Sequence, residues 1–221
     1  MVSPLTFVYL HGFASSPLAH KAAFLRPRLE EFGARLLAPD LNQPSFEGLT
    51  LTAQAEVVVA LLDELTASSD PPVVIGSSMG ALVALMASRQ RPGAVRRMLL
   101  IAPALKFVGA PLARALGSSL EAWERHGSLP VLHPEEGGRI YRVGFDLVRD
   151  ARGYDFDALV PSVPTMIVHG TADELVPFEA SQVFCREHAE IRLIPIAGGD
   201  HGLSDHMETI WERTKRFLLE G

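Results

Sequence analysis

Cysteine, lysine and long apolar runs are all scarce in this sequence, and each scarcity excludes a class of protein. Cys185 is the single cysteine among 221 residues, so the chain has no intramolecular disulfide framework. Lysine occurs only as Lys21, Lys106 and Lys215, the arginines are scattered, and the net charge is −6. A nucleic-acid-binding face needs clustered lysine and arginine, and this charge pattern argues against one. No run approaches the ~20 apolar residues that a membrane-spanning helix requires.

The rest of the composition, 48% hydrophobic and 21% charged, is that of an ordinary globular protein. A chain of this length can form one α/β domain, since single domains of ~200–250 residues are common in that class. The apolar stretch near the N-terminus has no basic region before it and runs directly into His11-Gly12, which favours a strand over a signal peptide. With the single cysteine, these features predict a cytoplasmic protein in which Cys185 is a packed thiol.

Short apolar runs alternate with segments of helical periodicity along most of the chain. Continuous apolar runs are typical of strands buried on both faces, and helices between them predict parallel strands. We therefore expect an α/β fold, a three-layer sandwich with a mainly parallel sheet of about six strands. The expected strands are Leu5–Leu10, Arg35–Ala38, Val73–Ile75, Met98–Ile101, Thr165–Val168 and Ile191–Ile194, and the expected helices are 18–32, 52–65, 81–90, 178–188 and 204–219.

Residues 103–160 interrupt this alternation. The segment first predicts an amphipathic helix, whose apolar stripe consists of Leu112, Leu116, Leu120 and Trp123. A hairpin with strands at 130–133 and 139–143 is expected next, around Glu135-Glu136-Gly137-Gly138. A short helix over 145–152 completes the segment.

The run from Val73 to Gly80 places Gly-x-Ser-x-Gly between an expected strand and an expected helix. A serine hydroxyl is a poor nucleophile at neutral pH and needs a neighbouring base and open access. A sharp strand-to-helix turn would expose Ser78, and it requires Gly76 and Gly80 because side chains there would meet the adjoining backbone. The N–H of Met79 would begin the helix, where it can stabilise an oxyanion. Taken alone, the motif is equally compatible with a glycine- and serine-rich loop without chemistry.

Two further loops carry the partners that a serine nucleophile needs. Asp173 follows the strand expected at 165–168, and His201 follows the strand expected at 191–194. Ligands of parallel sheets bind beyond the carboxyl ends of the strands, so Ser78, Asp173 and His201 are expected on one rim. Their order in the chain is that of a nucleophile on a strand–helix elbow. His201 would take the Ser78 proton and return it to the leaving group, while Asp173 would hold the imidazole tautomer.

Each partner has an alternative interpretation. His201 could be a surface loop histidine and Asp173 a turn aspartate. Asp200 and Asp146 are rival acids, but Asp200 directly precedes His201, and neighbours in sequence rarely face each other correctly for a triad.

The loop His11-Gly12-Phe13 follows the first expected strand and should supply a second oxyanion donor, the N–H of Phe13. Gly12 lets the backbone approach the elbow, and His11 is expected to be structural. His169 is expected to fix its own loop by hydrogen bonding. The remaining histidines show no metal-ligand spacing and are interpreted as surface or lid residues; they are His20, His126, His133, His188 and His206. The sequence has no dinucleotide, phosphate-loop or His-Glu-x-x-His motif, so we expect no cofactor and no metal.

Four motifs in this order resemble the α/β-hydrolase superfamily over essentially the whole chain. They are Leu10-His11-Gly12-Phe13, Gly76-Ser77-Ser78-Met79-Gly80, His169-Gly170-x-x-Asp173-x-x-Val176-Pro177 and Gly199-Asp200-His201. Leu-His-Gly-Phe-x-Ser-Ser-Pro with Lys21 nearby is similar to the small bacterial esterases of the YqiA type. The chain is also similar to compact acyl-protein thioesterases and acyl-glucuronide esterases. The resemblance implies a sheet without the two N-terminal antiparallel strands of larger hydrolases.

The resemblance also implies that residues 103–160 are a lid or cap insertion within a single α/β-hydrolase domain over residues 1–221. Lids shape the acyl pocket and exclude water. The apolar residues here could line the substrate or pack the core, and they are Leu105, Phe107, Leu112, Leu116 and Trp123. No dense basic cluster marks a site for coenzyme A or a carrier protein.

These observations predict a cofactor-independent serine hydrolase that cleaves a small carboxylic ester or thioester through an acyl-enzyme on Ser78. A serine peptidase or amidase is the first alternative, because the same machinery attacks amides. A hydrolase-fold protein that binds a ligand without turnover is the second. The expected partner is a small-molecule substrate, and the oligomeric state is left open.

Overall fold

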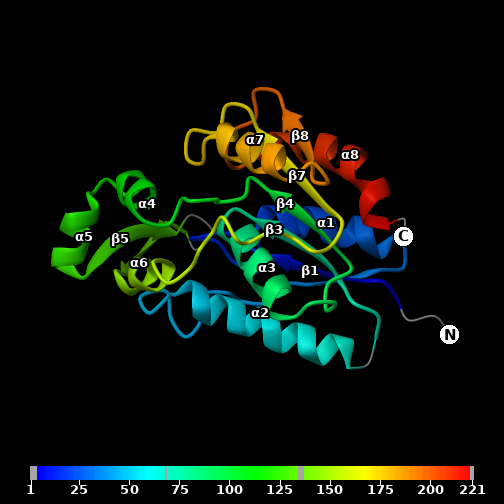
Figure 1. Cartoon of the computed structure of the whole chain (residues 1–221), viewed down its shortest axis with the longest axis horizontal. Helices are drawn as coiled ribbons and strands as arrows, with labels where there is room; N and C mark the ends of the chain where they lie inside the picture. The colour runs from blue at the N-terminus through cyan, green and yellow to red at the C-terminus, as the bar shows by residue number, and fades with distance from the viewer. Residues whose placement is uncertain (1–3, 68, 134–136, 220–221) are drawn as a thin grey trace.

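The computed structural model describes residues 4–67, 69–133 and 137–219, and a sheet of six strands lies at its centre (Figure 1). The strands are β1 (Thr6–Leu10), β2 (Arg35–Leu37), β3 (Val73–Ser77), β4 (Arg97–Ile101), β7 (Thr165–Gly170) and β8 (Arg192–Ile196). They pair in parallel in the order β2-β1-β3-β4-β7-β8. The predicted six-stranded parallel sheet is confirmed.

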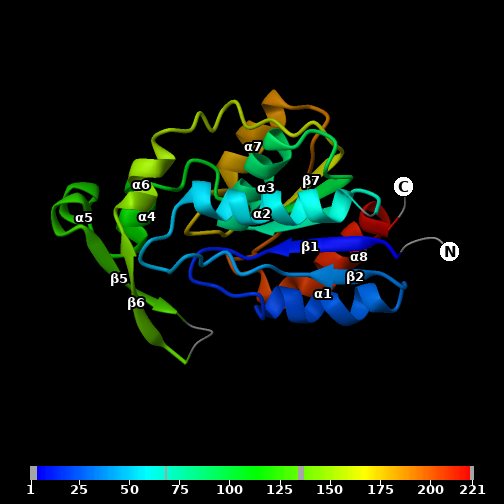
Figure 2. The same cartoon turned by 90° about the horizontal axis from the view of Figure 1, so that it is seen from below.

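Helices cover both faces of this sheet, which explains why the strands are apolar without alternation. On one face Phe7 and Tyr9 pack with α1 (His20–Glu30) and α8 (Met207–Leu219). On the other face Val8 and Leu10 pack with α2 (Leu51–Thr66), α3 (Met79–Gln90) and the Phe184 ring of α7 (Phe178–Glu187). Figure 2 shows α1 and α2 on opposite sides of β1. The result is the predicted three-layer sandwich.

The strand order reverses direction between β1 and β3. The chain leaves β1 toward β2 on one side, whereas β3, β4, β7 and β8 extend the sheet on the other. Parallel sheets bind their ligands at such a switch point, beyond the carboxyl ends of the strands. The loops after β1 and β3 are the ones that carry His11-Gly12-Phe13 and Ser78.

Residues 103–160 extend beyond the carboxyl ends of the strands, at the end of the molecule opposite both termini (Figures 1 and 2). Their elements are α4 (Ala110–Ala115), α5 (Leu120–His126), the antiparallel pair β5 (Ser128–His133) and β6 (Arg139–Gly144), and α6 (Asp146–Ala151). The predicted hairpin and short helix are confirmed. Glu135 and Glu136 of the predicted hairpin turn lie outside the described residues.

The prediction of one amphipathic helix through Leu112 and Trp123 is wrong, because two short helices occupy this stretch. Gly117 has a φ of +72°, which ends helical geometry after α4. The Ser119 side chain then accepts a hydrogen bond from the Ala122 N–H and starts α5 afresh. The apolar spacing continues across the two helices because Leu112 of α4 and Trp123 of α5 pack into the same hydrophobic core.

Several hydrogen bonds connect this segment to the main body, including one from the Thr52 N–H of α2 to Asp150 Oδ2 at 2.9 Å. His133 Nε2 donates to the Ser15 carbonyl at 3.3 Å, and the Gly144 N–H donates to the Glu47 carbonyl at 3.0 Å. Trp123 is fully buried and donates from Nε1 to the Val143 carbonyl at 3.2 Å.

Within the described ranges, none of the helices combines the length and apolarity needed to cross a bilayer.

Candidate active site

Ser78 stands in the turn between β3 and α3 in a conformation that few side chains tolerate. Its φ of +53° and ψ of −118° lie outside the regions open to ordinary L-residues. Backbone hydrogen bonds hold it there, since its N–H donates to the Ile101 carbonyl at 2.9 Å. Its own carbonyl accepts from Ala81 and from Ala104, each at 3.1 Å. The turn presents a half-buried hydroxyl at the end of the strand.

Two glycines make this turn possible by letting backbone segments touch. A Cβ on Gly76 would lie 2.7 Å from the Gly80 carbonyl oxygen, and a Cβ on Gly80 would overlap the Leu10 carbonyl. Gly80 therefore lets α3 begin against the end of β1. The motif predicted that a side chain at either position would meet the adjoining backbone, and these distances confirm it.

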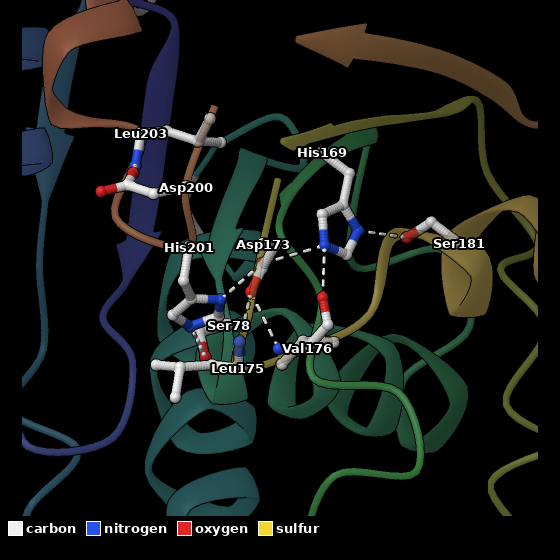
Figure 3. Close-up of polar contacts among 9 residues, drawn as sticks. All are labelled: Ser78, His169, Asp173, Leu175, Val176, Ser181, Asp200, His201 and Leu203. Carbon is white, nitrogen blue, oxygen red and sulfur yellow. Dashed lines mark hydrogen bonds and ion pairs between the residues drawn. The ribbon is translucent and has the colours of Figure 1, made fainter. Parts of the chain in front are cut away.

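Ser78, His201 and Asp173 form a chain of hydrogen bonds across three loops (Figure 3). Ser78 Oγ lies 3.0 Å from His201 Nε2, and His201 Nδ1 lies 2.7 Å from Asp173 Oδ2. A carboxylate accepts only, so His201 carries its proton on Nδ1 and offers Nε2 as an acceptor to the serine hydroxyl. The His201 side chain is 22% exposed and, like Ser78, lines a cavity.

Asp173 is fully buried, and four hydrogen bonds satisfy its carboxylate. Oδ1 accepts from the N–H groups of Leu175 (2.9 Å) and Val176 (2.8 Å), while Oδ2 accepts from His169 Nε2 (3.0 Å) and His201 Nδ1. Burial alone would raise the pKa of Asp173, but hydrogen bonds from His169 and His201 outweigh it and lower that pKa far below its usual range. The carboxylate is therefore ionised at neutral pH.

His169 holds the Asp173 loop in place, as the sequence predicted. Its Nε2–H is shared between Asp173 Oδ2 and the Val176 carbonyl, each at 3.0 Å. Its Nδ1 lies 2.7 Å from the Ser181 hydroxyl of α7, and the ring is fully buried. Ser181 was not identified from the sequence. Its position one helical turn into α7 carries no motif, and only the fold brings it to His169.

Glycine contacts also join the two loops that carry Asp173 and His201. A Cβ on Gly170 would lie 2.7 Å from the Asp200 carbonyl oxygen and would overlap the Gly199 carbonyl. The Ala172 N–H donates to that same Gly199 carbonyl at 2.9 Å. The sequence signal for this contact was Gly198-Gly199 before Asp200. The sequence alone could not show that Gly199 contacts Gly170, because the two are 29 positions apart.

The loop after β1 brings Phe13, one of the two predicted oxyanion donors, beside the elbow, and Met79 begins α3 at the elbow itself. A Cβ on Gly12 would lie 3.1 Å from Ser78 Cβ, so this loop reaches the nucleophile closely. Across the residues that the structure describes, neither the Phe13 N–H nor the Met79 N–H has a hydrogen-bond acceptor. His11 is buried and structural, since its Nε2 accepts from the Leu41 N–H at 3.0 Å and its Nδ1 donates to the Gly12 carbonyl at 3.0 Å.

The rival acids have other partners. Asp200 Oδ1 accepts from the Leu203 N–H at 2.7 Å and so fixes the turn after His201. Asp146 is exposed and pairs with Arg149 at 2.7 Å on α6. Cys185 fits the predicted packed thiol, because burial raises its pKa to about 11.

One cavity borders Ser78, and another lies beside α7. One of about 340 Å³ is lined by Ser78, His201 and the loop and helix start at residues 12–21. The other, of about 260 Å³, lies between Leu105 and α7 and does not reach Ser78. The sequence left open whether the apolar residues of the insertion line a substrate or pack the core. Trp123 and its buried neighbours pack the core, and Leu105 lines the second cavity.

Comparison with known proteins identifies relatives over nearly the whole chain. The family described as Uncharacterised protein family (UPF0227) matches residues 6–218. The mitochondrial palmitoyl-protein thioesterase ABHD10 of Homo sapiens is 24% identical over 207 residues, which are 84% of this chain and 66% of that protein. The Bos taurus protein of the same name is 21% identical over 79% of this chain and 58% of its own length. This chain therefore spans less than two thirds of these curated relatives.

Solved structures show the same fold. Est1E from Butyrivibrio proteoclasticus with ferulic acid bound superposes with a TM-score of 0.84 at 24% identity, covering 99% of this chain and 89% of that one. Alpha/beta hydrolase domain-containing protein 10 from mouse superposes with a TM-score of 0.71 at 18% identity, covering 98% and 92%. The six-stranded parallel sheet with its flanking helices is that of the α/β hydrolases.

Proposed function

We propose that this chain, which belongs to the Uncharacterised protein family (UPF0227) within the α/β-hydrolase superfamily, cleaves small carboxylic esters or thioesters through an acyl-enzyme on Ser78. The observation that carries the proposal is the hydrogen-bonded series from Ser78 Oγ to His201 Nε2 at 3.0 Å and from His201 Nδ1 to Asp173 Oδ2 at 2.7 Å. The relatives named as thioesterases support a hydrolase of this kind.

In the proposed mechanism Ser78 Oγ attacks the carbonyl carbon while its proton passes to His201 Nε2. Asp173 stays ionised and stabilises the imidazolium that forms. The free N–H groups of Phe13 and Met79 would bind the oxyanion, and one such donor contributes about 3 kcal/mol to the transition state. The leaving group departs with the proton from His201, and water then hydrolyses the acyl-enzyme with His201 as base.

We infer a single domain over residues 1–221 in which residues 103–160 serve as a lid over this rim. Three observations support the inference. The segment lies beyond the carboxyl ends of the strands (Figure 2), and its buried Trp123 shares one apolar cluster with α2 and α3. His133 of the segment also contacts Ser15, two residues after Phe13.

Substitution of the nucleophile tests the proposal directly. Ser78→Ala should lower kcat for p-nitrophenyl esters by about 10⁶ while thermal unfolding stays within a few degrees of wild type, because only the hydroxyl is removed. Ser69→Ala, a serine three residues after the end of α2 and away from the rim, is the matched control. An unchanged rate in Ser78→Ala would end the proposal.

A panel of substrates separates the remaining alternatives. Acyl thioesters and p-nitrophenyl esters of graded chain length, compared with the corresponding anilides, distinguish ester or thioester preference from amidase activity. Failure of wild-type Ser78 to react with a fluorophosphonate would favour a hydrolase-fold protein that binds a ligand without turnover.

A further inference from the structure

Asp173 shares one carboxylate oxygen between two histidines that have different surroundings. Oδ2 accepts from His201 Nδ1 at 2.7 Å and from His169 Nε2 at 3.0 Å (Figure 3). His201 lines the cavity beside Ser78, whereas the His169 ring is fully buried. His169 therefore cannot exchange a proton with a substrate, and any part it plays in the reaction must pass through Asp173.

The contacts of His169 determine where its protons are. Nε2 lies 3.0 Å from Asp173 Oδ2 and 3.0 Å from the Val176 carbonyl, and both oxygens only accept, so Nε2 carries a proton. Nδ1 lies 2.7 Å from the Ser181 hydroxyl of α7, which can donate or accept. The direction of the hydrogen bond with Ser181 therefore decides whether the ring is neutral or a cation.

A neutral ring fits the surroundings of His169. Among the described residues, Asp173 is the one carboxylate hydrogen-bonded to it. In the proposed reaction His201 becomes an imidazolium, and a second buried cation on Oδ2 would take up the charge that stabilises it. The fully buried Ser181 hydroxyl then donates to Nδ1, and both nitrogens of the ring are satisfied without a net charge.

The hydrogen bonds from the two histidines also set the charge state of Asp173. Burial raises the pKa of this carboxyl, and the bonds from His169 and His201 more than offset that effect. From α7 the Phe178 ring lies against His169, with 5.7 Å between the ring centroids. The other titratable groups on the neighbouring loops and helices are Glu174, Glu179, Asp200, His20 and Lys21.

We propose that Ser181 and His169 are positioning residues for the reaction. Ser181 donates to His169 Nδ1, and the neutral ring donates from Nε2 to the carboxylate oxygen that holds His201. This rests on the proposed hydrolase function and adds to it two buried residues that act through Asp173. Loss of a donor to Oδ2 makes the coupled Asp173–His201 pair bind a proton more tightly, so the active, deprotonated form appears only at higher pH.

Two substitutions at His169 separate the hydrogen-bond donor from the ring. In His169→Phe the acid limb of the kcat/KM profile for p-nitrophenyl acetate should move to higher pH by about one unit, a tenfold change in proton affinity. In His169→Gln the side-chain amide can donate to the same oxygen and cannot become a cation, so the limb should stay within about 0.2 unit of wild type. KM should change less than about twofold in both variants, because the side chain is buried away from the cavity.

A matched set of serine variants tests Ser181. Ser181→Ala removes the donor to Nδ1 and so weakens the Nε2–H as a donor, and the acid limb should move in the same direction by about half a unit. Ser181→Thr keeps the hydroxyl and should restore the wild-type limb. Ser88→Ala, which removes another buried serine hydroxyl near the end of α3, should leave the limb unchanged. The midpoint of the limb does not depend on the amount of folded enzyme, so a loss of stability cannot imitate the shift.

The outcomes separate this inference from the function on which it rests. An acid limb at the wild-type pH in both His169→Phe and Ser181→Ala overturns the positioning role and leaves the hydrolase intact. A shift in His169→Gln as large as that in His169→Phe shows that the ring acts as a cation, and it overturns the neutral donor. If His169→Phe does not fold, Ser181→Ala compared with Ser88→Ala decides alone. No hydrolysis by wild type together with no fluorophosphonate labelling of Ser78 overturns the proposed function itself and this inference with it.

Discussion

The rim of the sheet and the insertion at 103–160 are held in place by different kinds of contact. At the rim, backbone lies directly on backbone, with Gly80 against the Leu10 carbonyl and Gly170 against the Gly199 carbonyl. The insertion has one contact of this kind, Gly144 against the Glu47 carbonyl, and otherwise depends on side-chain packing around Trp123 and on hydrogen bonds such as that from the Thr52 N–H to Asp150. Contacts between backbones cannot relax, so the rim is the less tolerant region and the insertion the more adaptable one.

Gly80→Ala should have the largest effect on stability. The new Cβ would overlap two backbone carbonyls, those of Leu10 and His11, and neither can move without displacing β1. We expect a loss of about 3 kcal/mol or more in the free energy of unfolding and a Tm lower by about 10 °C, measured by thermal denaturation.

Gly48→Ala is the matched control for this substitution. Its Cβ would lie 3.3 Å from the Ser45 hydroxyl, which can rotate away, and Gly48 has no positive φ. Its stability should change by less than about 1 kcal/mol. Equal Tm values for the two variants would contradict the difference between the regions.

Acid should weaken the rim through Asp173, with a smaller effect. The pKa of Asp173 is lowered in the folded state, so the unfolded chain binds the proton first as the pH falls. The contribution is complete above the ordinary aspartate pKa of about 3.9 and is lost toward the lower folded pKa. We expect this residue alone to remove on the order of 2 kcal/mol between pH 5 and pH 2.

The variant Asp173→Asn isolates this contribution, because it cannot titrate. Denaturant unfolding at several pH values should give a shallower fall in stability for Asp173→Asn than for wild type in this range. Parallel curves would show that the carboxylate does not contribute as described.

His133→Leu should have the smallest effect, because the insertion relies little on this polar contact. Among the described residues the buried Nδ1 of His133 has no hydrogen-bond partner, and its Nε2 contact with Ser15 is long at 3.3 Å. The Ser15 carbonyl keeps its shorter bond from Asn42 Nδ2 at 2.9 Å. Stability should change by less than about 1 kcal/mol in the same denaturation assay, and a loss comparable to that of Gly80→Ala would refute the distinction.

Much of the fold could be predicted because local signals and the global arrangement agree. Apolar runs bounded by turn residues identified all six strands, and Gly-x-Ser-x-Gly located the elbow, since its glycines contact residues close by in sequence or at the adjacent strand end. The catalytic roles of Ser78, Asp173 and His201 remain predictions. Their proximity followed from parallel strands sharing one edge.

The features that sequence reasoning got wrong or missed depend on single residues that end a helix or on contacts between residues far apart in the chain. Apolar residues recur every three or four positions from Leu112 to Trp123, which predicts one helix. Gly117 and Ser119 lie between these two residues, and they end one helix and begin another. The support of His169 by Ser181 requires α7 to pack beside β7. The pairing of Gly170 with Gly199 cannot be obtained without the tertiary structure.

The hydrogen bond from the Ala104 N–H to the Ser78 carbonyl has a consequence for how this protein can diversify. The insertion starts at a peptide group that is attached to the elbow itself. We expect an exchanged insertion that keeps this hydrogen bond to leave the turn undisturbed, and a displacement of Ala104 to remove one of the bonds that hold the Ser78 backbone. An exchange of residues 103–160 would therefore have to keep the Ala104 peptide group in place for the elbow to keep its geometry.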